Sequence, residues 1–384
     1  MKIVIAIDSF KGSLSSVEAG EAAAAGIRRV FPDAGIVIRP VADGGEGTVD
    51  ALVKGMGGRY AETTVSNPLG RKISSRYGIL PGNTAVIEMA AASGLTLLSE
   101  KERDPMSAST FGTGEMILDA VRNGCRDLII GIGGSATNDG GIGCLQALGF
   151  GMLNRDGEQV CPGAKGLAAL ERISADNIPA EIRECSFSVA CDVTNPLCGE
   201  NGCSRIFAPQ KGADDESITV MDGLLRKYAE LTKDIFPAAS PDTPGAGAAG
   251  GMGFALMYYL GAELVPGAEL IMRKTNLEDE LRDCDIVVTG EGRIDSQTSM
   301  GKAPSAAARL AKKYGKPVIA FCGCTGGGAE LCNSCGIDAF FPVLRKITSL
   351  EDAMDKDNAR KNLSDTAEQV FRAIKISEQL GDKI

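Results

Sequence analysis

The sequence predicts an α/β fold made of two α/β domains, one of which holds a doubly wound parallel sheet. Near both ends of the chain, short apolar stretches of strand length alternate with patterns of helical period, as in successive β-α-β units. The middle of the chain has several strand patterns in a row, which favours a different sheet there. The length of 384 residues suits two domains, or one large core with an insertion.

The first elements read clearly from the amino-terminal end. A buried strand is expected at residues 2–7, and Asp8 stands at its carboxyl end. Ser15 and Glu18 fit a capping box, which predicts the start of a helix. A second strand at residues 36–40 is followed by another acidic loop and a helix. Ligands bind beyond the carboxyl ends of strands in open α/β sheets, so both acidic loops are candidate ligand sites.

The middle of the chain changes pattern. Residues 59–66, 71–80 and 85–89 alternate between polar and apolar side chains, as antiparallel strands do. The Pro/Gly/Ala-rich stretch at residues 237–253 is either a flexible linker or a loop that approaches a ligand with its backbone. Further patterns predict a helix at 114–122, a hairpin at 150–160, a strand at 186–191 and a helix at 214–233.

The alternation of strand and helix patterns that is typical of a parallel sheet returns towards the carboxyl end. Strands are expected at residues 285–289, 317–321 and 339–344, and the first of them is followed by a polar loop at 290–298. Pro304 stands where the first turn of a helix would begin. A last amphipathic helix is predicted from the apolar stripe Leu363, Ala367, Val370 and Ile374.

Because parallel α/β units open and close the chain, we expect residues 1–64 and 285–384 to form one Rossmann- or flavodoxin-like domain. Residues 65–284 would form a second α/β domain inserted into the first. Charged loops follow strands in both parts, and we expect an active-site cleft between the two domains.

The most informative segment is the glycine-rich turn at residues 133–141, between an apolar strand at 128–132 and a helical pattern at 142–148. Bare backbone N–H groups beside a helix N-terminus form a ready site for a phosphate. Residues 131–136 also fit the G-x-G-x-x-A dinucleotide fingerprint, so a nucleotide-dependent dehydrogenase is an alternative. A purely structural turn is another alternative, and the P-loop pattern is absent.

Composition restricts the partners. The net charge of −10 argues against nucleic acid and anionic membrane surfaces. The longest apolar stretch, residues 248–260, is too short to span a bilayer. The first apolar run, residues 3–7, is too short for the core of a signal peptide. We therefore expect a cytoplasmic protein that acts on a small molecule, and a homodimer is compatible with the sequence.

The titratable residues restrict the chemistry further. The chain has no histidine, so acid–base work must fall to Asp, Glu, Lys or Tyr. It has twelve cysteines, which in a long chain of this kind are expected to be reduced core residues. Cys322, Cys324, Cys332 and Cys335 could hold structural zinc, but the spacing of the first pair favours free thiols.

Five polar loops combine carboxylates, hydroxyls and lysines after predicted strands. Such a set, without histidine, suits Mg²⁺-assisted phosphoryl transfer, which needs charge neutralisation and positioning more than covalent chemistry. The loops contain Asp8 and Lys11, Asp43 and Glu46, Ser135 to Asp139, Asp192 and Lys211, and Glu291 and Asp295.

Several stretches, taken together, resemble the type I glycerate kinases, the bacterial glycerate 2-kinase family. They cover almost the whole chain in order, which makes the resemblance specific. It implies ATP-dependent phosphorylation of D-glycerate, at the 2-hydroxyl in most members, by two α/β domains with a cleft between them. The stretches are DSFKGSLSS from Asp8, VADGGEGT from Val41, GIGGSATNDGGIGCLQALG from Gly131, CDVTNPLCGENG from Cys191, FAPQKGA from Phe207, PGAGAAGGMG from Pro244 and TGEGRIDSQTSMGKAP from Thr289.

Roles can be assigned to residues of these stretches under that resemblance. Asp192 is the first candidate for the base that orients the glycerate hydroxyl, and Asp8 is the second. Lys11 and Lys211 would neutralise the substrate carboxylate or the transferred phosphoryl group. The remaining assignments are Gly133, Gly134, Ser135, Ala136, Thr137 and Asn138 for the ATP phosphates, Ser9, Asp43, Glu46 and Arg71 for the substrate, and Glu291 and Asp295 for Mg²⁺.

Other functions remain open at this point. Transfer to the 3-hydroxyl of glycerate would use the same residue types. An NAD-dependent dehydrogenase rests on the fingerprint at residues 131–136, and a small-ligand sensor could be built on the same sheet. Formation of ADP that depends on D-glycerate separates the kinase from both.

Overall fold

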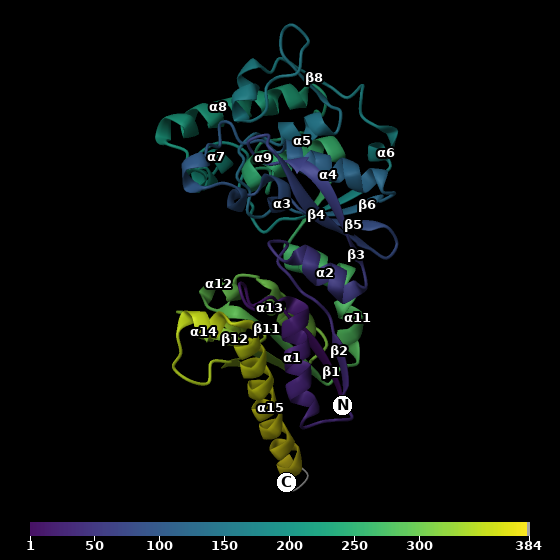
Figure 1. Cartoon of the computed structure of the whole chain (residues 1–384), viewed down its shortest axis with the longest axis vertical. Helices are drawn as coiled ribbons and strands as arrows, with labels where there is room; N and C mark the ends of the chain where they lie inside the picture. The colour runs from purple at the N-terminus through teal and green to yellow at the C-terminus, as the bar shows by residue number, and fades with distance from the viewer. Residues whose placement is uncertain (382–384) are drawn as a thin grey trace. The chain divides into compact units, whose positions relative to one another are not determined.

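The computed structural model describes residues 1–381 and confirms the α/β class (Figure 1). The contacts divide the chain into two compact units. Unit 1 comprises Met1–Asp43, Asp50–Met56 and the chain from Ala268 onward, and unit 2 comprises Gly44–Val49 and Gly57–Gly267. Within the described chain, no helix is both long enough and apolar enough to cross a membrane.

Unit 1 is built mainly from the two terminal parts of the chain and contains five strands. Its strands are β1 (Lys2–Ile7), β2 (Gly35–Ile38), β11 (Ile286–Ile294), β12 (Val318–Thr325) and β13 (Ala339–Pro342). Its helices are α1 (Ser16–Arg28), α2 (Thr48–Met56), α10 (Gly267–Lys274), α11 (Leu277–Arg282), α12 (Ser296–Ser299), α13 (Ala303–Lys312), the short η5 (Ala329–Cys335), α14 (Leu350–Met354) and α15 (Lys356–Gly381).

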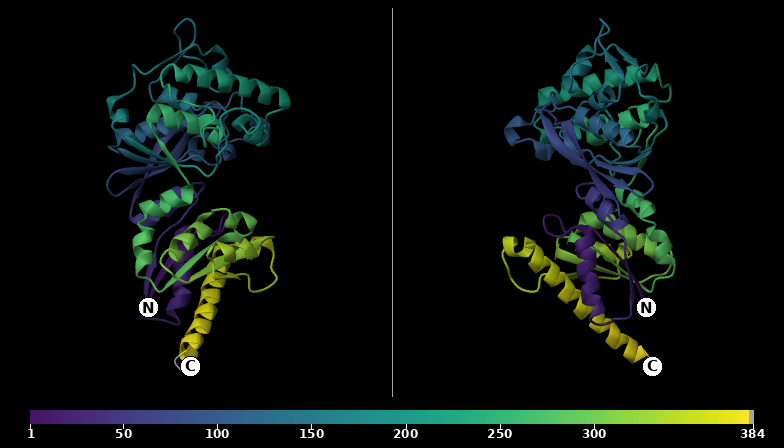
Figure 2. Two further views of the ribbon diagram at one scale, coloured as in Figure 1. Left: turned by 180° about the vertical axis from the view of Figure 1, so that it is seen from behind. Right: turned by 45° about the vertical axis from the view of Figure 1, so that its right-hand side comes forward.

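The strands of unit 1 form one parallel sheet in the order β13-β12-β11-β1-β2. Side chains of β1 alternate between its two faces. Ile3, Ile5 and Ile7 pack with α1 and α15 on one face, while Val4 and Ala6 pack with α11 and α13 on the other. This produces a three-layer α/β/α unit, in which α1 and α15 lie side by side (Figure 2).

The order of these strands fixes where a ligand is expected. From β1 the chain proceeds outward to β2, and it returns on the other side of β1 as β11, β12 and β13. The direction of winding therefore reverses between β1 and β11, and ligands of open α/β sheets bind at the carboxyl ends of strands at such a point. Asp8 follows β1 there, and Glu291 lies one residue beyond Gly290, the register partner of Ile7.

Local signals of the sequence appear in unit 1 as predicted. Ser15 and Glu18 form a capping box at the start of α1. Pro304 lies in the first turn of α13. The last amphipathic helix is α15, which buries Leu363 and Ala367 against the sheet.

Unit 2 is larger and holds the remaining elements. Its strands are β3 (Arg59–Ser66), β4 (Lys72–Leu80), β5 (Thr84–Glu88), β6 (Asp127–Gly131), β7 (Gly151–Leu153), β8 (Arg172–Ser174), β9 (Ser186–Ala190) and β10 (Glu263–Val265). Its helices are α3 (Ala90–Ser93), α4 (Phe111–Arg122), α5 (Ile142–Ala147), α6 (Ala180–Arg183), α7 (Cys203–Phe207), α8 (Asp215–Lys233) and α9 (Ala248–Leu260), with short 3-10 helices at Leu95–Leu97, Glu100–Glu102, Ala164–Ala169 and Pro209–Lys211.

The main sheet of unit 2 is mixed, with the order β10-β9-β6-β5-β4-β3. The β3, β4 and β5 strands pair in antiparallel fashion, as their alternating pattern predicted, and β5, β6, β9 and β10 are parallel. The parallel strands follow one another in a single direction across the sheet. The direction of winding does not reverse among these parallel strands. The strand order alone therefore does not indicate a ligand site in this sheet.

One expectation about local structure is wrong. The strand from residue 285 does not end at Thr289 but continues as β11 to Ile294, because its register with β12, a partner distant in sequence, extends as far as Thr325. The hairpin expected at 150–160 does form: the chain turns at Asn154 to Gly157, and an antiparallel bridge joins Leu153 to Gln159. On its other side β7 pairs with β8.

The unit boundaries fall at other residues than the predicted domain boundaries. Residues 57–64 belong to unit 2, because β3 pairs along its whole length with β4. Residues 268–284 belong to unit 1, where Leu277 and Leu281 join the core under α13.

Candidate functional site

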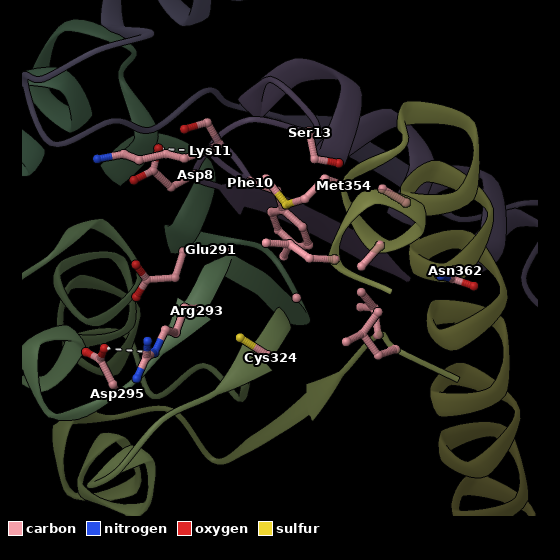
Figure 3. Close-up of a pocket in the computed structure, with 18 of the residues that line it drawn as sticks. Asp8, Phe10, Lys11, Ser13, Glu291, Arg293, Asp295, Cys324, Met354 and Asn362 are labelled. Atoms are coloured by element: carbon pink, nitrogen blue, oxygen red, sulfur yellow. Dashed lines mark hydrogen bonds and ion pairs between the residues drawn. The ribbon is translucent and has the colours of Figure 1, made fainter. Parts of the chain in front are cut away.

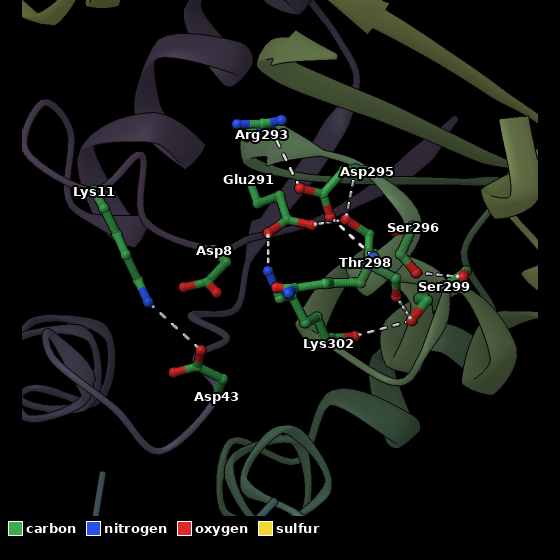
Figure 4. Close-up of polar contacts among 12 residues, drawn as sticks. Asp8, Lys11, Asp43, Glu291, Arg293, Asp295, Ser296, Thr298, Ser299 and Lys302 are labelled. Atoms are coloured by element: carbon green, nitrogen blue, oxygen red, sulfur yellow. Dashed lines mark hydrogen bonds and ion pairs between the residues drawn. The ribbon is translucent and has the colours of Figure 1, made fainter. Parts of the chain in front are cut away.

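Unit 1 gathers six of the predicted site residues in and beyond the carboxyl-terminal parts of its strands, namely Asp8, Ser9, Lys11, Asp43, Glu291 and Asp295. Asp8 follows β1, Asp43 comes after β2, and Glu291 projects from β11. Asp8 lies among Lys11, Asp43 and Glu291 (Figure 4). The Lys11 Nζ lies 3.7 Å from Asp43 Oδ2, on the exposed side of the group. Strand ends far apart in sequence thus bring three carboxylates and an ammonium group together.

Asp8 is the carboxylate with the most unusual surroundings. Only 7% of the residue is exposed. Burial, with the charges of Asp43 and Glu291 adding to it, raises the pKa of Asp8 from 3.8 to about 7, against the hydrogen bond donated by Ser9 N and the charge of Lys11. A carboxylate with this pKa can accept a proton near neutral pH, which an ordinary aspartate does poorly.

Glu291 is held from two sides. The Thr298 hydroxyl donates a hydrogen bond of 2.6 Å to Glu291 Oε1, and Lys302 Nζ lies 4.0 Å from Oε2. Burial raises the pKa of Glu291, and the charges of Asp295 and Asp43 act in the same direction, against Thr298 and Lys302. The glutamate is therefore a buried anion that a bound cation would stabilise.

Asp295 has a structural task of its own. Its Oδ1 accepts a hydrogen bond from Gln297 N and so caps α12, while Oδ2 lies 3.4 Å from Arg293 Nε. Thr298 supports the same turn, since its hydroxyl also accepts a hydrogen bond from Asp295 N. The capping role fixes Asp295 beside Glu291 and Arg293.

The carboxylates can be tested for their fit to Mg²⁺. Among residues 1–381, no group of three or more His, Cys, Asp or Glu side chains is placed to hold a metal ion by itself. Mg²⁺ is usually bound through one or two carboxylates together with substrate phosphates. Glu291 and Asp295 lie close enough for the charge of Asp295 to raise the pKa of Glu291. This donor set fits a magnesium ion that arrives with a phosphate, not a closed protein site.

These residues line one cavity of about 380 Å³ (Figure 3). Its charged side is formed by Asp8, Lys11, Glu291, Arg293 and Asp295, whereas Phe10 and Met354 lie on the opposite side. The volume is within the usual range for a small-molecule site. The cavity belongs entirely to unit 1.

In unit 2, Lys211 holds the glycine-rich turn. Its Nζ donates hydrogen bonds of 2.8 Å to Ser135 Oγ and 2.7 Å to the Thr137 carbonyl, and only 2% of the residue is exposed. Burial lowers the pKa of Lys211 to about 8, although the charge of Asp139 acts in the opposite direction. The lysine thus fixes the conformation of Ser135 to Thr137.

The expected free amides at the start of α5 are not free. The Asp139 carboxylate accepts hydrogen bonds from Gly141 N and Gly143 N, and Thr110 Oγ1 accepts one from Cys144 N. A protein side chain therefore occupies the place that the dinucleotide fingerprint reserves for a pyrophosphate. This geometry contradicts the interpretation of residues 131–136 as such a fingerprint.

The predicted phosphate loop is mostly buried. Gly133 and Gly134 are exposed, whereas Ser135, Ala136, Thr137 and Asn138 are buried. The Thr137 hydroxyl and the side-chain amide oxygen of Asn138, Oδ1, are buried without a hydrogen-bond partner. A role of this loop in nucleotide binding stays a prediction, and Gly133 and Gly134 are its accessible part.

The Pro/Gly/Ala-rich stretch is not a flexible linker but the support of this loop. It runs into α9, and Gly140 N donates a hydrogen bond of 2.9 Å to the Gly250 carbonyl. At Gly250 the φ angle is +71°, and a Cβ there would lie 2.1 Å from the Thr137 carbonyl oxygen. Only glycine allows this conformation and this approach.

We therefore expect Gly250→Ala to lower the melting temperature strongly, by the equivalent of about 2 kcal/mol or more. Gly223→Ala is the matched control, since Gly223 lies exposed within α8 with open space around its Cα. Alanine there is expected to raise stability by about 0.5–1 kcal/mol. Thermal unfolding of both variants checks this, and equal melting temperatures would contradict it.

The other predicted residues occupy separate places. Asp192 is exposed, and its Oδ1 accepts a hydrogen bond of 2.8 Å from Gly267 N at the start of α10. Arg71 is paired at 2.7 Å with Glu102 Oε1 on an exposed surface. Glu46 is exposed in unit 2, and Ser9 donates its backbone N–H to Asp8. Of these, only Ser9 lines the cavity.

Three polar residues and one apolar wall of this site were not predicted from the sequence. Arg293, Thr298 and Lys302 lie in the stretch from Thr289 that carried the resemblance, so the signal for them was already present. The wall of the cavity around residues 343–354 has no such signal, because it consists of ordinary apolar residues. The cysteines of the described chain are free thiols, and Cys324 is exposed in the cavity wall.

Comparisons with known proteins agree with one family. The model of the Glycerate kinase family matches residues 3–375. The glycerate 2-kinase of Escherichia coli K12 is 49% identical over 354 residues, which covers 92% of this chain and 93% of the relative. The glycerate kinase of Haemophilus influenzae is 44% identical, with 97% and 99% covered. A crystal structure assigned to the glycerate kinases, from Salmonella typhimurium LT2, superposes with a TM-score of 0.91 at 45% identity and covers 99% of both chains.

Proposed function

The chain belongs to the glycerate kinase family, and from this premise we propose that it transfers a phosphoryl group from ATP to the 2-hydroxyl of D-glycerate. The observation that carries the proposal is Asp8, a buried carboxylate with a pKa of about 7 among charged residues at the strand ends of unit 1. A hydroxyl nucleophile needs such a group to orient it and to accept its proton.

Asp8 replaces Asp192 as our first candidate for the base. Asp192 is exposed, and one of its oxygens caps α10. Asp8 is held rigidly, since its backbone N–H bonds to the Gly290 carbonyl and its Oδ1 accepts from Ser9 N. In the reaction, the hydroxyl oxygen of glycerate bonds to the γ-phosphorus, the bond to the leaving ADP oxygen breaks, and the hydroxyl proton passes to Asp8.

The cations of unit 1 would neutralise the phosphates and the carboxylate of glycerate. Lys11, Arg293 and Lys302 lie around the carboxylates, and each has an exposed or half-exposed side chain. We assign Mg²⁺ to Glu291 and Asp295 with the phosphates, where it would neutralise charge as the phosphoryl group moves. In unit 2, Lys211 would act as a positioning residue by holding Ser135 and Thr137.

The 2-hydroxyl is favoured over the 3-hydroxyl by the relative from Escherichia coli, which is a glycerate 2-kinase and 49% identical. We expect Mg²⁺-dependent formation of ADP with D-glycerate and none with glycerol, because glycerol lacks the carboxylate that the lysines would bind. Phosphorus NMR of the product distinguishes 2-phosphoglycerate from 3-phosphoglycerate. Equal turnover with glycerol would contradict the carboxylate-binding role, and 3-phosphoglycerate would contradict the regiochemistry.

A further inference from the structure

The cavity of unit 1 is larger and more apolar than the proposed phosphoryl transfer to glycerate requires. Glycerate has three carbons, and each bears an oxygen, so it has no use for an apolar wall. Yet Phe10 and Met354 lie opposite the charged residues (Figure 3), and Val343, Leu350 and Ala353 also line the cavity. A cavity with one apolar side and one charged side suits a ligand that has an apolar part and a charged part.

We propose that this apolar side binds the purine base of the nucleotide, with the phosphates directed towards Lys11, Arg293 and Lys302. The inference rests on the proposed use of ATP and adds to it the place of the base. Nucleotides combine a flat, largely apolar base with a polyanion at the other end, which matches the two sides of the cavity. The base-binding site would then lie in unit 1 and not on the glycine-rich turn of unit 2.

Exposed apolar side chains on α14 support this assignment. Leu350 is 78% exposed and Met354 37% exposed, and both line the cavity. A single exposed apolar side chain is ordinary at a protein surface, but several that line one cavity form an apolar patch of the kind that marks a ligand site. The helix is nevertheless held in place against the loop after β1, because a Cβ at Gly12 would lie 2.6 Å from the terminal methyl group of Met354.

The charged side of the cavity suits the phosphates of a nucleotide only if they bind together with a cation. Asp8, Asp43, Glu291 and Asp295 stand there against Lys11, Arg293 and Lys302. Four carboxylates outnumber three cations, so a free polyanion would be repelled, while a magnesium–nucleotide complex has a much smaller negative charge. The nucleotide is therefore expected to bind with Mg²⁺ and weakly without it.

A second cavity in unit 1 does not combine an apolar side with a charged side. It lies between the β12–β13 edge of the sheet and α15, and Arg345 is the one charged residue among those that line it. It lacks the carboxylates that a magnesium–nucleotide complex needs, and it does not lie at the reversal point of the sheet. The charged cavity is therefore the better candidate for the nucleotide.

A thiol in the cavity wall allows a direct test with the unmodified protein. Cys324 is exposed and lines the cavity, whereas Cys161 is exposed in unit 2 and serves as an internal control. We expect Mg²⁺–ADP to slow alkylation of Cys324 by iodoacetamide at least about fivefold and to leave Cys161 unchanged, as read by peptide mass spectrometry. D-Glycerate alone is expected to protect neither thiol.

A variant pair tests the apolar side itself. Met354→Glu places a charge where the base would lie and is expected to raise the KM for ATP about tenfold or more, with the KM for D-glycerate unchanged. Ile347→Glu is the control, because Ile347 is fully exposed outside the cavity on the same segment. The control is expected to keep both KM values, and melting temperatures near the wild-type value show that both variants fold.

The outcomes distinguish this inference from the proposed function. If calorimetry shows that Mg²⁺–ADP binds while Cys324 stays unprotected, or if Met354→Glu keeps the wild-type KM for ATP, the base lies elsewhere and the inference is wrong. If Mg²⁺–ADP protects Cys324 but no ADP forms with D-glycerate, the nucleotide site stands and the proposed reaction is wrong.

Discussion

Asp8→Asn is expected to lower kcat by about 10²-fold or more and, at the same time, to raise the melting temperature. Asparagine keeps the size of the side chain and can still accept the hydrogen bond from Ser9 N, but it cannot take a proton from a hydroxyl group. The loss of turnover therefore reports on the base, and the gain in stability reports on the removal of a buried charge.

The sign of the stability change follows from the pKa. Burial and the neighbouring carboxylates raise the pKa of Asp8 from 3.8 to about 7. Between these two values the folded protein binds more protons than the unfolded chain, so stability falls as pH rises through this range. Above pH 7 the buried charge of Asp8 lowers the free energy of unfolding by its full amount. This is about 4 kcal/mol, because each unit by which the pKa is raised corresponds to about 1.36 kcal/mol. Asparagine removes this cost, so the gain in stability should be largest at pH 8 and vanish near pH 4.

The pH profile of the wild type provides a second measurement. If Asp8 is the base, kcat/KM should rise about tenfold per pH unit below 7 and level off above it, since this profile reports the free enzyme. Asp192→Asn is the matched control. Its amide oxygen can still cap α10, so most of the turnover should remain. A collapse of turnover in Asp192→Asn, with Asp8→Asn active, would return the role of the base to Asp192.

The predictable part of the fold is the part that local patterns determine. The five apolar residues after Lys2 allow little besides a buried strand, and the Ser15–Glu18 pair marks a helix start through bonds that span only three residues. The antiparallel strands β3 to β5 likewise follow from alternation and nearby turns. In each case the partners that stabilise the element are close in sequence.

The parts that failed depend on partners far away in the chain. The extension of β11 to Ile294 is set by β12, whose residues lie about thirty positions later. Local composition marks where strands and turns occur, but it does not show how far each pairing extends.

The sequence indicated which kinds of residue form the candidate site better than it indicated which of them lie together. Carboxylates such as Asp8 and Glu291 stand out in the sequence because each follows a short apolar run of strand length and has small or polar neighbours. Their grouping at the reversal between β1 and β11 requires the strand order, which the sequence does not state. Asp192 looked equivalent to Asp8 in sequence, and only burial separates the two. The apolar wall of α14 gave no signal, since exposed and buried leucines look the same in sequence.

Asp139 shows how a residue in a glycine-rich turn can serve the fold instead of a ligand. It is fully buried, and its oxygens accept hydrogen bonds from Thr110 N, Thr110 Oγ1, Gly141 N and Gly143 N at 2.8–3.4 Å. Burial raises its pKa, while these four donors and the nearby Lys211 favour the charged form. The carboxylate is therefore the acceptor around which the turn, the start of α5 and the start of α4 are arranged.

Asp139→Asn should accordingly destabilise the protein by about 3 kcal/mol or more. An asparagine has one acceptor oxygen in place of two, so its NH₂ group must face at least one of the four donors. The change also removes a negative charge that favours the buried Lys211 ammonium. Asp156→Asn is the matched control, because Asp156 is exposed in the turn after β7 and its replacement should change stability by less than about 0.5 kcal/mol. Thermal and urea unfolding at pH 7 compare the two variants. Equal stabilities would mean that α5 and its turn do not depend on the Asp139 carboxylate, and the glycine-rich turn would again be a candidate for binding an external anion.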